Sequence, residues 1–151
     1  MTPTPQQIAE ASRAAMLKDD HATASLGIAI DQVGPGTCTA SMTVRRDMLN
    51  GHAICHGGLI TTLADSAFAF ACNAYNEVTV ASGFDVNLLA AARLDDVLTA
   101  QAVEVSKSGR TGVYDITVTN QRGERVAAFR GRSYTMKGKP LVDGLPVGKQ
   151  P

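Results

Sequence analysis

The chain has 151 residues, of which 44% are hydrophobic and 19% are charged. This composition predicts one folded domain with a sizeable core and excludes a disordered chain. The formal net charge is zero, so bulk electrostatics favour neither nucleic acid nor a membrane surface as a partner. No apolar run reaches the length of a membrane span, and we expect no membrane partner.

The cysteines and the first residues bear on the compartment. Cys38, Cys55 and Cys72 are odd in number and lack CxxC spacing, which is typical of a protein in a reducing environment. Residues 1–20 are polar and carry acids, unlike a signal peptide. We therefore expect a cytoplasmic protein.

The pattern of apolar residues predicts the elements in chain order. A short helix is expected over 5–18, followed by strands over 26–33 and 37–46. A loop over 47–57 then leads to one long helix, 58–75, which is apolar nearly all round and is therefore expected to be buried. Four further strands are predicted over 78–89, 97–106, 112–120 and 125–136.

This order of elements predicts an α+β fold in which one antiparallel sheet wraps around a central buried helix. Residues 1–136 would form the single domain. Residues 137–151 have little periodicity and are expected to be a flexible C-terminal tail. Because the edge of a sheet presents unpaired backbone groups, we also expect two copies to join their sheets edge to edge.

Asp65 is the one charged residue in the predicted helix 58–75. A carboxylate in an apolar helix is unfavourable to bury unless it is paired or has a chemical role. We predict that Asp65 is catalytic, either deprotonating a water molecule or itself attacking a carbonyl carbon, and the sequence leaves both open. The alternative is a solvated carboxylate without a role.

A pair of glycines precedes this helix. The N–H groups of Gly57 and Gly58 lie at a helix N-terminus, where they can stabilise negative charge on a substrate oxygen. Gly57 and Asp65 are eight residues apart, which is about 12 Å along one helix. Both groups must meet the same carbonyl, so we predict that Gly57 of one subunit serves Asp65 of another, with two equivalent sites per dimer.

Other loop side chains are weaker candidates. His56 either orients the loop or contacts the substrate, and Asn50 either binds a substrate carbonyl or water, or caps its own turn. The spacing of His52, Cys55 and His56 matches no well-formed zinc motif, and we expect no metal or cofactor. The sequence also lacks GxxxxGK[ST], GxGxxG, GxSxG and HExxH motifs, which argues against phosphate loops, dinucleotide folds, serine α/β-hydrolases and zincins.

Several basic residues near strand ends are solvated surface charges by default. If they gather at one edge, they could hold the phosphates of a nucleotide-bearing thiol carrier. The candidates are Lys107, Arg110, Arg130 and Arg132.

The loop and helix together resemble the hotdog-fold acyl-CoA thioesterases. The resemblance is carried by Asn50-Gly51-His52, by His56-Gly57-Gly58 and by Asp65 eight residues after Gly57, and it extends over residues 8–136. The segments TGVYDI at 111–116 and FRG at 129–131 make the chain most similar to the phenylacetate-degradation thioesterase family. Ala90-Ala91-Ala92 departs from it, because relatives commonly have an Arg-Pro turn there.

The resemblance implies an enzyme that hydrolyses an aryl-acetyl-CoA, such as phenylacetyl- or hydroxyphenylacetyl-CoA, to the free acid and coenzyme A. It also implies Asp65 as the catalytic carboxylate, Gly57 as the oxyanion-hole donor, and Asn50 and His56 as groups that position water or substrate. Ser82 falls near a family position for a supporting polar residue. The family is usually a tetramer, a dimer of dimers, and uses no cofactor beyond the coenzyme A of its substrate.

Two other interpretations of the sequence remain open. A hotdog dehydratase or hydratase would pair His52 or His56 with a carboxylate across the subunit interface. A non-catalytic acyl-CoA-binding protein would bind the same ligands without turnover.

Overall fold

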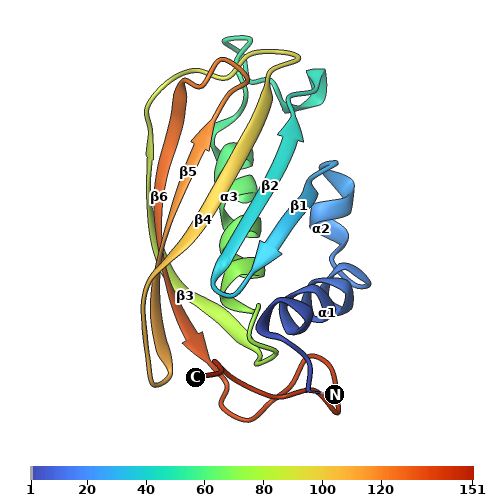
Figure 1. Cartoon of the computed structure of the whole chain (residues 1–151). Helices are drawn as coiled ribbons and strands as arrows, with labels where there is room; N and C mark the ends of the chain where they lie inside the picture. Colours follow the sequence, from blue (N-terminus) through green and yellow to red (C-terminus); the bar gives the residue numbers. More distant parts are fainter. Residues whose placement is uncertain (1) are drawn as a thin grey trace.

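A six-stranded antiparallel sheet curves around one long helix in the computed structural model, which describes residues 2–151 (Figure 1). The strand order across the sheet is β1-β2-β4-β5-β6-β3, with every pair antiparallel. In chain order the elements are α1 (Pro5–Leu17), α2 (His21–Ser25), β1 (Ala29–Gly34), β2 (Thr37–Thr43), the 3-10 turn η1 (Arg46–Met48), α3 (Gly57–Cys72), β3 (Thr79–Leu88), β4 (Val97–Ser108), β5 (Thr111–Thr119) and β6 (Arg125–Thr135).

The predicted α+β arrangement around a central helix is confirmed, and most element boundaries agree within three residues. The first strand was predicted from residue 26 and begins at Ala29. Differences of the same size occur where the strand predicted to end at residue 46 ends at Thr43, and where the helix predicted to end at residue 75 ends at Cys72. The short helix α2 precedes β1, with Asp20 accepting from Thr23 N–H as its N-cap. A helix of five residues is too short to produce a readable apolar period. None of the helices within residues 2–151 is long and apolar enough to cross a membrane.

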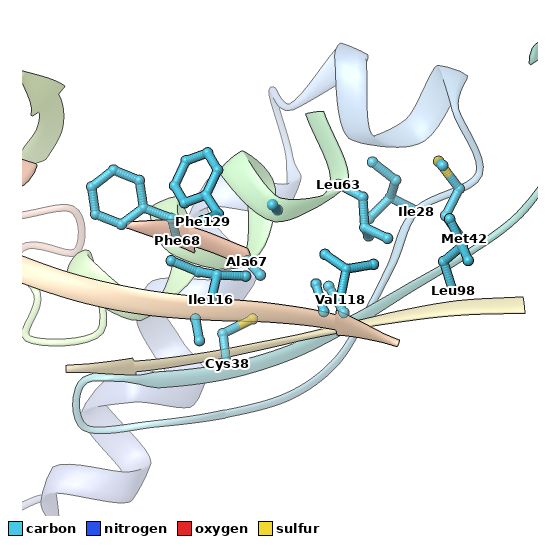
Figure 2. Packing of buried hydrophobic residues seen from close by; sticks show 14 of the residues in the cluster. Ile28, Cys38, Met42, Leu63, Ala67, Phe68, Leu98, Ile116, Val118 and Phe129 are labelled. Carbon is cyan, nitrogen blue, oxygen red and sulfur yellow. The ribbon is translucent and has the colours of Figure 1, made fainter. Parts of the chain in front are cut away.

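Helix α3 is the centre of the core. Figure 2 shows Leu63, Ala67 and Phe68 of this helix turned toward residues of the sheet, including Ile116 and Phe129. The Phe68 ring lies 5.6 Å from that of Tyr114 and 5.9 Å from that of Phe129, a spacing typical of packed aromatic side chains. Close packing also requires the glycine of the FRG segment, because a Cβ at Gly131 would lie 2.7 Å from Phe68 Cε2.

Strand β3 lies at the edge of the sheet and pairs with β6 alone, so its other edge is unpaired (Figure 1). Its apolar side chains Val80, Phe84 and Leu88 are 42%, 41% and 53% exposed. An edge strand of ten residues with exposed apolar groups is unusual in a protein that stays monomeric.

The C-terminal residues 137–151 pack beside α1, at the bottom of the view in Figure 1. Asn76 holds them: its Oδ1 accepts from the N–H groups of Leu141 and Val142 at 3.0 and 2.8 Å, and its Nδ2 donates to three carbonyls of the segment, those of Val142, Leu145 and Pro146. Gly148 N–H also donates to the carbonyl of Tyr75 at 2.9 Å. These contacts argue against the mobile tail expected from composition.

Candidate active site

The N-terminus of α3 leaves one backbone donor free. His56 is the N-cap: its Nδ1 accepts from Gly58 N–H at 3.4 Å, and its carbonyl accepts from the amides of Leu59 and Ile60. Gly57 N–H has no acceptor among residues 2–151. A free amide at a helix N-terminus can bind an anionic or developing negative oxygen. Of the two glycines singled out from the sequence, Gly57 therefore keeps its donor available and Gly58 does not.

Position 57 also requires glycine for a steric reason. Leu88, at the end of β3, lies directly over the Gly57 Cα, and a Cβ placed there would collide with Leu88 Cδ1. At Gly58 the nearest atom to such a Cβ would be His56 Nδ1 at 3.5 Å, an ordinary contact. No sequence pattern pointed to Leu88, because its approach depends on where the edge strand lies beside the helix.

Asn50 organises the loop in front of the helix. Its Oδ1 accepts from His52 N–H at 2.9 Å and from Ile54 N–H at 3.4 Å, so of its two predicted roles the turn cap is observed. Its Nδ2 has no acceptor within the described part of the chain. This second donor therefore remains available beside the helix N-terminus.

Asn50 and Gly57 line the same cavity, of about 340 Å³. Its other walls are mainly apolar and come from the loop, from α3 and from the segment that follows β3: Ile54, Cys55, Ile60, Leu88, Leu89, Ala90, Ala91 and Ala92. A mostly apolar cavity with a few convergent donors is typical of a small-molecule site. The side chains of the three alanines are short, so this wall projects little into the cavity.

Asp65 lies on the same helix but does not line this cavity. Its side chain is partly buried and has no hydrogen-bond or ion-pair partner among the described residues. Burial raises the pKa of the Asp65 carboxyl above its ordinary value of 3.8. Both Gly57 and Asp65 belong to α3, so the separation of about 12 Å along the helix axis applies to a single chain.

The remaining loop side chains form no metal site. No group of three or more His, Cys, Asp or Glu side chains able to hold a metal occurs in the part of the chain that the structure describes. Cys55 is buried, and burial raises the pKa of its thiol above 9.0. A thiol kept protonated is a poor nucleophile.

The structure does not gather the basic candidates into one cluster. Arg130 donates through Nε and Nη2 to Asp115 at 2.6 and 2.7 Å, and Arg132 donates to Asp85 at 2.8 Å. Lys107 instead lines a separate hollow at the far end of α3.

Neither of the two remaining candidates lines that hollow, although Arg110 directly follows Gly109, which does. Arg110 is exposed in the turn between β4 and β5, and Ser82, at a bulge in β3, donates to the carbonyl of Arg132 at 3.1 Å.

Comparison with known proteins identifies the family of the chain. Residues 52–127, which include Gly57 and Asp65, match the family model described as the thioesterase superfamily. Acyl-coenzyme A thioesterase PaaI of Escherichia coli K12 is 43% identical over 124 residues, covering 82% of this chain and 89% of the relative. The chain belongs to the thioesterase superfamily. The family resemblance noted in the sequence is thereby confirmed, and thioesterase is the enzyme class.

Solved structures of this superfamily share the fold. The E. coli PaaI protein from the phenylacetic acid degradation operon superposes with a TM-score of 0.88 at 40% identity, covering 90% of this chain and 99% of that one. An asparagine-to-aspartate mutant of PaaI from Thermus thermophilus gives 0.73 at 34% identity, covering 76% and 98%. A hypothetical thioesterase protein with coenzyme A from Streptococcus pneumoniae gives 0.71 at 27%, covering 74% and 88%. The hotdog fold is confirmed.

Proposed function

We propose that this protein is an acyl-CoA thioesterase that hydrolyses aryl-acetyl-CoA thioesters, of the phenylacetyl- or hydroxyphenylacetyl-CoA type, to the free acid and coenzyme A. The observation that carries the proposal is the pairing, on one buried helix, of a free Gly57 N–H with an unpartnered, partly buried Asp65. The name of the E. coli relative supports acyl-CoA as the substrate class, and coenzyme A is present in the streptococcal structure.

In this mechanism Asp65 supplies the basic or nucleophilic oxygen. As a base, Asp65 takes a proton from water while the water oxygen attacks the thioester carbonyl; the C–S bond then breaks and the thiolate takes up a proton. As a nucleophile, its carboxylate attacks the same carbon and expels the thiolate, and water hydrolyses the resulting anhydride. In both routes the Gly57 N–H stabilises the negative oxygen of the tetrahedral intermediate.

The two groups act together only in an oligomer. Because about 12 Å of helix separates Gly57 from Asp65 within one chain, the Gly57 donor comes from the partner subunit. The exposed apolar edge strand β3 supports a dimer in which two sheets join. A dimer of dimers is the assembly we propose, with two sites in each dimer.

The remaining site residues bind and orient the substrate. The free Nδ2 of Asn50 donates to the substrate carbonyl or to the attacking water, while His56, as N-cap, fixes the direction of the Gly57 N–H. The apolar cavity beside Gly57 receives the aryl-acetyl group, and its alanine wall leaves room for a ring. Gly58 allows the chain to approach the substrate closely, and Ser82 supports the site from β3.

Coenzyme A phosphates are the proposed ligands of Lys107, Arg110 and Arg132. Arg132 would have to leave Asp85, to which it donates at 2.8 Å, whereas Lys107 already faces a hollow. Coenzyme A enters as part of the substrate, and we propose no other cofactor.

The test is thiol release from phenylacetyl-, hydroxyphenylacetyl-, benzoyl-, acetyl- and long-chain acyl-CoA by the wild type and by Asp65→Asn. We expect turnover that is fastest with the aryl-acetyl substrates and is lost in the variant. Turnover that survives the substitution would move the chemistry away from Asp65. Absence of turnover with every thioester would favour a hydratase or a binding protein, which enoyl-CoA hydration and ligand titration would then separate.

A further inference from the structure

A second hollow lies at the opposite end of α3 from Gly57. It measures about 310 Å³ and is formed where the C-terminal residues pass the turn between β4 and β5. We call it the tail pocket; its lining residues are Glu77, Lys107, Gly109, Lys137, Val147, Gly148 and Lys149. It shares no residue with the cavity at Gly57.

Backbone contacts hold the two tail lysines in place. Gly138, next to Lys137, donates its N–H to Glu77 Oε2 at 2.8 Å. Gly148, next to Lys149, donates its N–H to the carbonyl of Tyr75 at 2.9 Å. The lysines are therefore presented by an anchored segment, in the corner where Figure 1 shows the C-terminus close to the sheet.

Two of the lysines approach the same aromatic ring. The Nζ atoms of Lys107 and Lys149 lie 5.8 and 5.7 Å from the centre of the Tyr75 ring, within the range of a cation–π contact. Lys149 also pairs with Glu104 at 2.7 Å. Lys137 has no side-chain acceptor among residues 2–151. Against three ammonium groups the surroundings provide two carboxylates, Glu77 and Glu104, so the pocket keeps an excess of positive charge.

We infer that the tail pocket binds the phosphate groups at the nucleotide end of the acyl-CoA substrate. Lysines bind phosphate as compact point charges, and the glycines at positions 109 and 148 let a ligand approach the backbone. Asp65 and the C-cap Asn73 are eight residues apart, about 12 Å along α3. The extended pantetheine chain between thioester and diphosphate is longer than this. The inference rests on the proposed function, and it adds Lys137 and Lys149 to the predicted contact at Lys107.

The test compares two thioesters of the same acid. Phenylacetyl-CoA carries the phosphates, and phenylacetyl-pantetheine lacks them. The double variant Lys137→Gln/Lys149→Gln should raise KM for phenylacetyl-CoA by about 2- to 30-fold, because each exposed charge pair contributes about 1.4- to 5-fold to binding and two such charges are removed. Its kcat, and its KM for phenylacetyl-pantetheine, should not change. Lys139→Gln is the matched control for the single variant Lys137→Gln, because it removes one positive charge from the same segment outside the pocket.

Lys137→Gln alone guards against a folding defect, because Lys137 forms no ion pair that the fold depends on; it should give a smaller KM increase in the same direction. An unchanged KM for phenylacetyl-CoA, or an equal rise for both thioesters, would overturn the inference. Calorimetric titration with adenosine 3′,5′-bisphosphate tests the pocket without turnover: we expect binding to the wild type that the double variant weakens and added salt reduces.

Failure of the inference and failure of the proposed function give different results. An enzyme that hydrolyses neither thioester but binds the bisphosphate through Lys137 and Lys149 would refute the thioesterase proposal and keep a phosphate-binding pocket. Hydrolysis of both thioesters with no bisphosphate binding would support the thioesterase proposal and refute the phosphate-binding pocket. Bisphosphate binding without any effect on KM would show that the pocket serves a separate nucleotide and would overturn its assignment to the substrate.

Discussion

Asp65 and Glu104 are both partly buried carboxylates, but their surroundings differ. Glu104 accepts from the hydroxyls of Tyr75 and Tyr114 at 2.7 and 3.1 Å and pairs with Lys149 at 2.7 Å. Burial acts to raise the pKa of Glu104, but these three donors outweigh it and the pKa lies below the ordinary 4.5. Asp65 has burial alone, and its pKa is raised. Partners, and not burial, therefore separate a carboxylate that stabilises the fold from one available for chemistry.

The largest effect that this comparison predicts is the loss of catalysis in Asp65→Asn. We expect kcat/KM on the preferred thioester to fall by about 10²- to 10⁴-fold, the usual contribution of a positioned base. In the wild type, activity should fall as the pH drops through the pKa of Asp65, so the midpoint of the acid limb should lie above 3.8. Initial rates across a pH series would measure both quantities.

The same variant, Asp65→Asn, should gain stability while it loses activity. A raised carboxyl pKa in the folded state means that folding disfavours the ionised form, so this group lowers stability as the pH rises. Asp65→Asn should therefore raise the melting temperature at pH 7. Asp31→Asn, on the exposed surface of β1, is the control and should alter neither rate nor melting temperature. A variant that loses activity and stability together would mean that Asp65 has a structural role.

The second prediction concerns the donor that serves Asp65. Gly57→Ala keeps the N–H but forces its Cβ against Leu88 Cδ1, so the helix start must shift away from the oxygen it stabilises. We expect kcat/KM to fall on the order of 10- to 100-fold, part of the effect of removing an oxyanion donor. Gly58→Ala meets only ordinary contacts and should lose less.

A double variant separates the steric effect from the chemical one. Leu88→Ala removes the atoms that the new Cβ would meet, so Gly57→Ala/Leu88→Ala should recover part of the activity lost in Gly57→Ala. No recovery, with the fold intact by circular dichroism, would show that the close approach of Leu88 is not what makes glycine necessary at position 57.

The comparison also shows what could be read from the sequence. Asp65 stands out because its neighbours along the chain are apolar, and the start of α3 was predicted within one residue of Gly57. Both signals are local. The partners of Glu104 are 29, 10 and 45 residues away in the chain, so no local pattern could reveal them. The packing of Leu88 over Gly57 and the anchoring of residues 137–151 by Asn76 were missed for the same reason.

The third prediction tests the partnered carboxylate. Glu104→Gln leaves two buried tyrosine hydroxyls and Lys149 without an anionic acceptor, which should lower the free energy of unfolding at pH 7 by about 1–3 kcal/mol. Because the pKa of Glu104 is lowered by folding, its stabilisation is present above the ordinary glutamate pKa and is lost as the pH falls through the folded value.

Denaturant titrations at pH 7 and at pH 3 would measure this difference, which should shrink at the lower pH. Glu124→Gln is the matched control: Glu124 pairs with Arg122 at 2.6 Å, but both side chains are more than half exposed, and such pairs contribute only ~0.2–1 kcal/mol. Equal losses in the two variants would remove the distinction between partnered burial and surface pairing.

The smallest effect is expected at Asn76, which brings Lys149 to Glu104 indirectly by anchoring the C-terminal segment. Asn76 is fully buried and has a φ of 54°, so glycine at this position keeps the backbone conformation and removes only the five side-chain contacts. Asn76→Gly should lower the free energy of unfolding by about 1–2 kcal/mol and speed limited proteolysis within residues 137–151.

The pKa of Glu104 should then rise toward 4.5, since Lys149 would be held less firmly, and NMR titration of the Glu104 carboxyl carbon would detect the change. A faster-cleaved tail with an unchanged Glu104 pKa would show that the two tyrosines alone keep this carboxylate ionised.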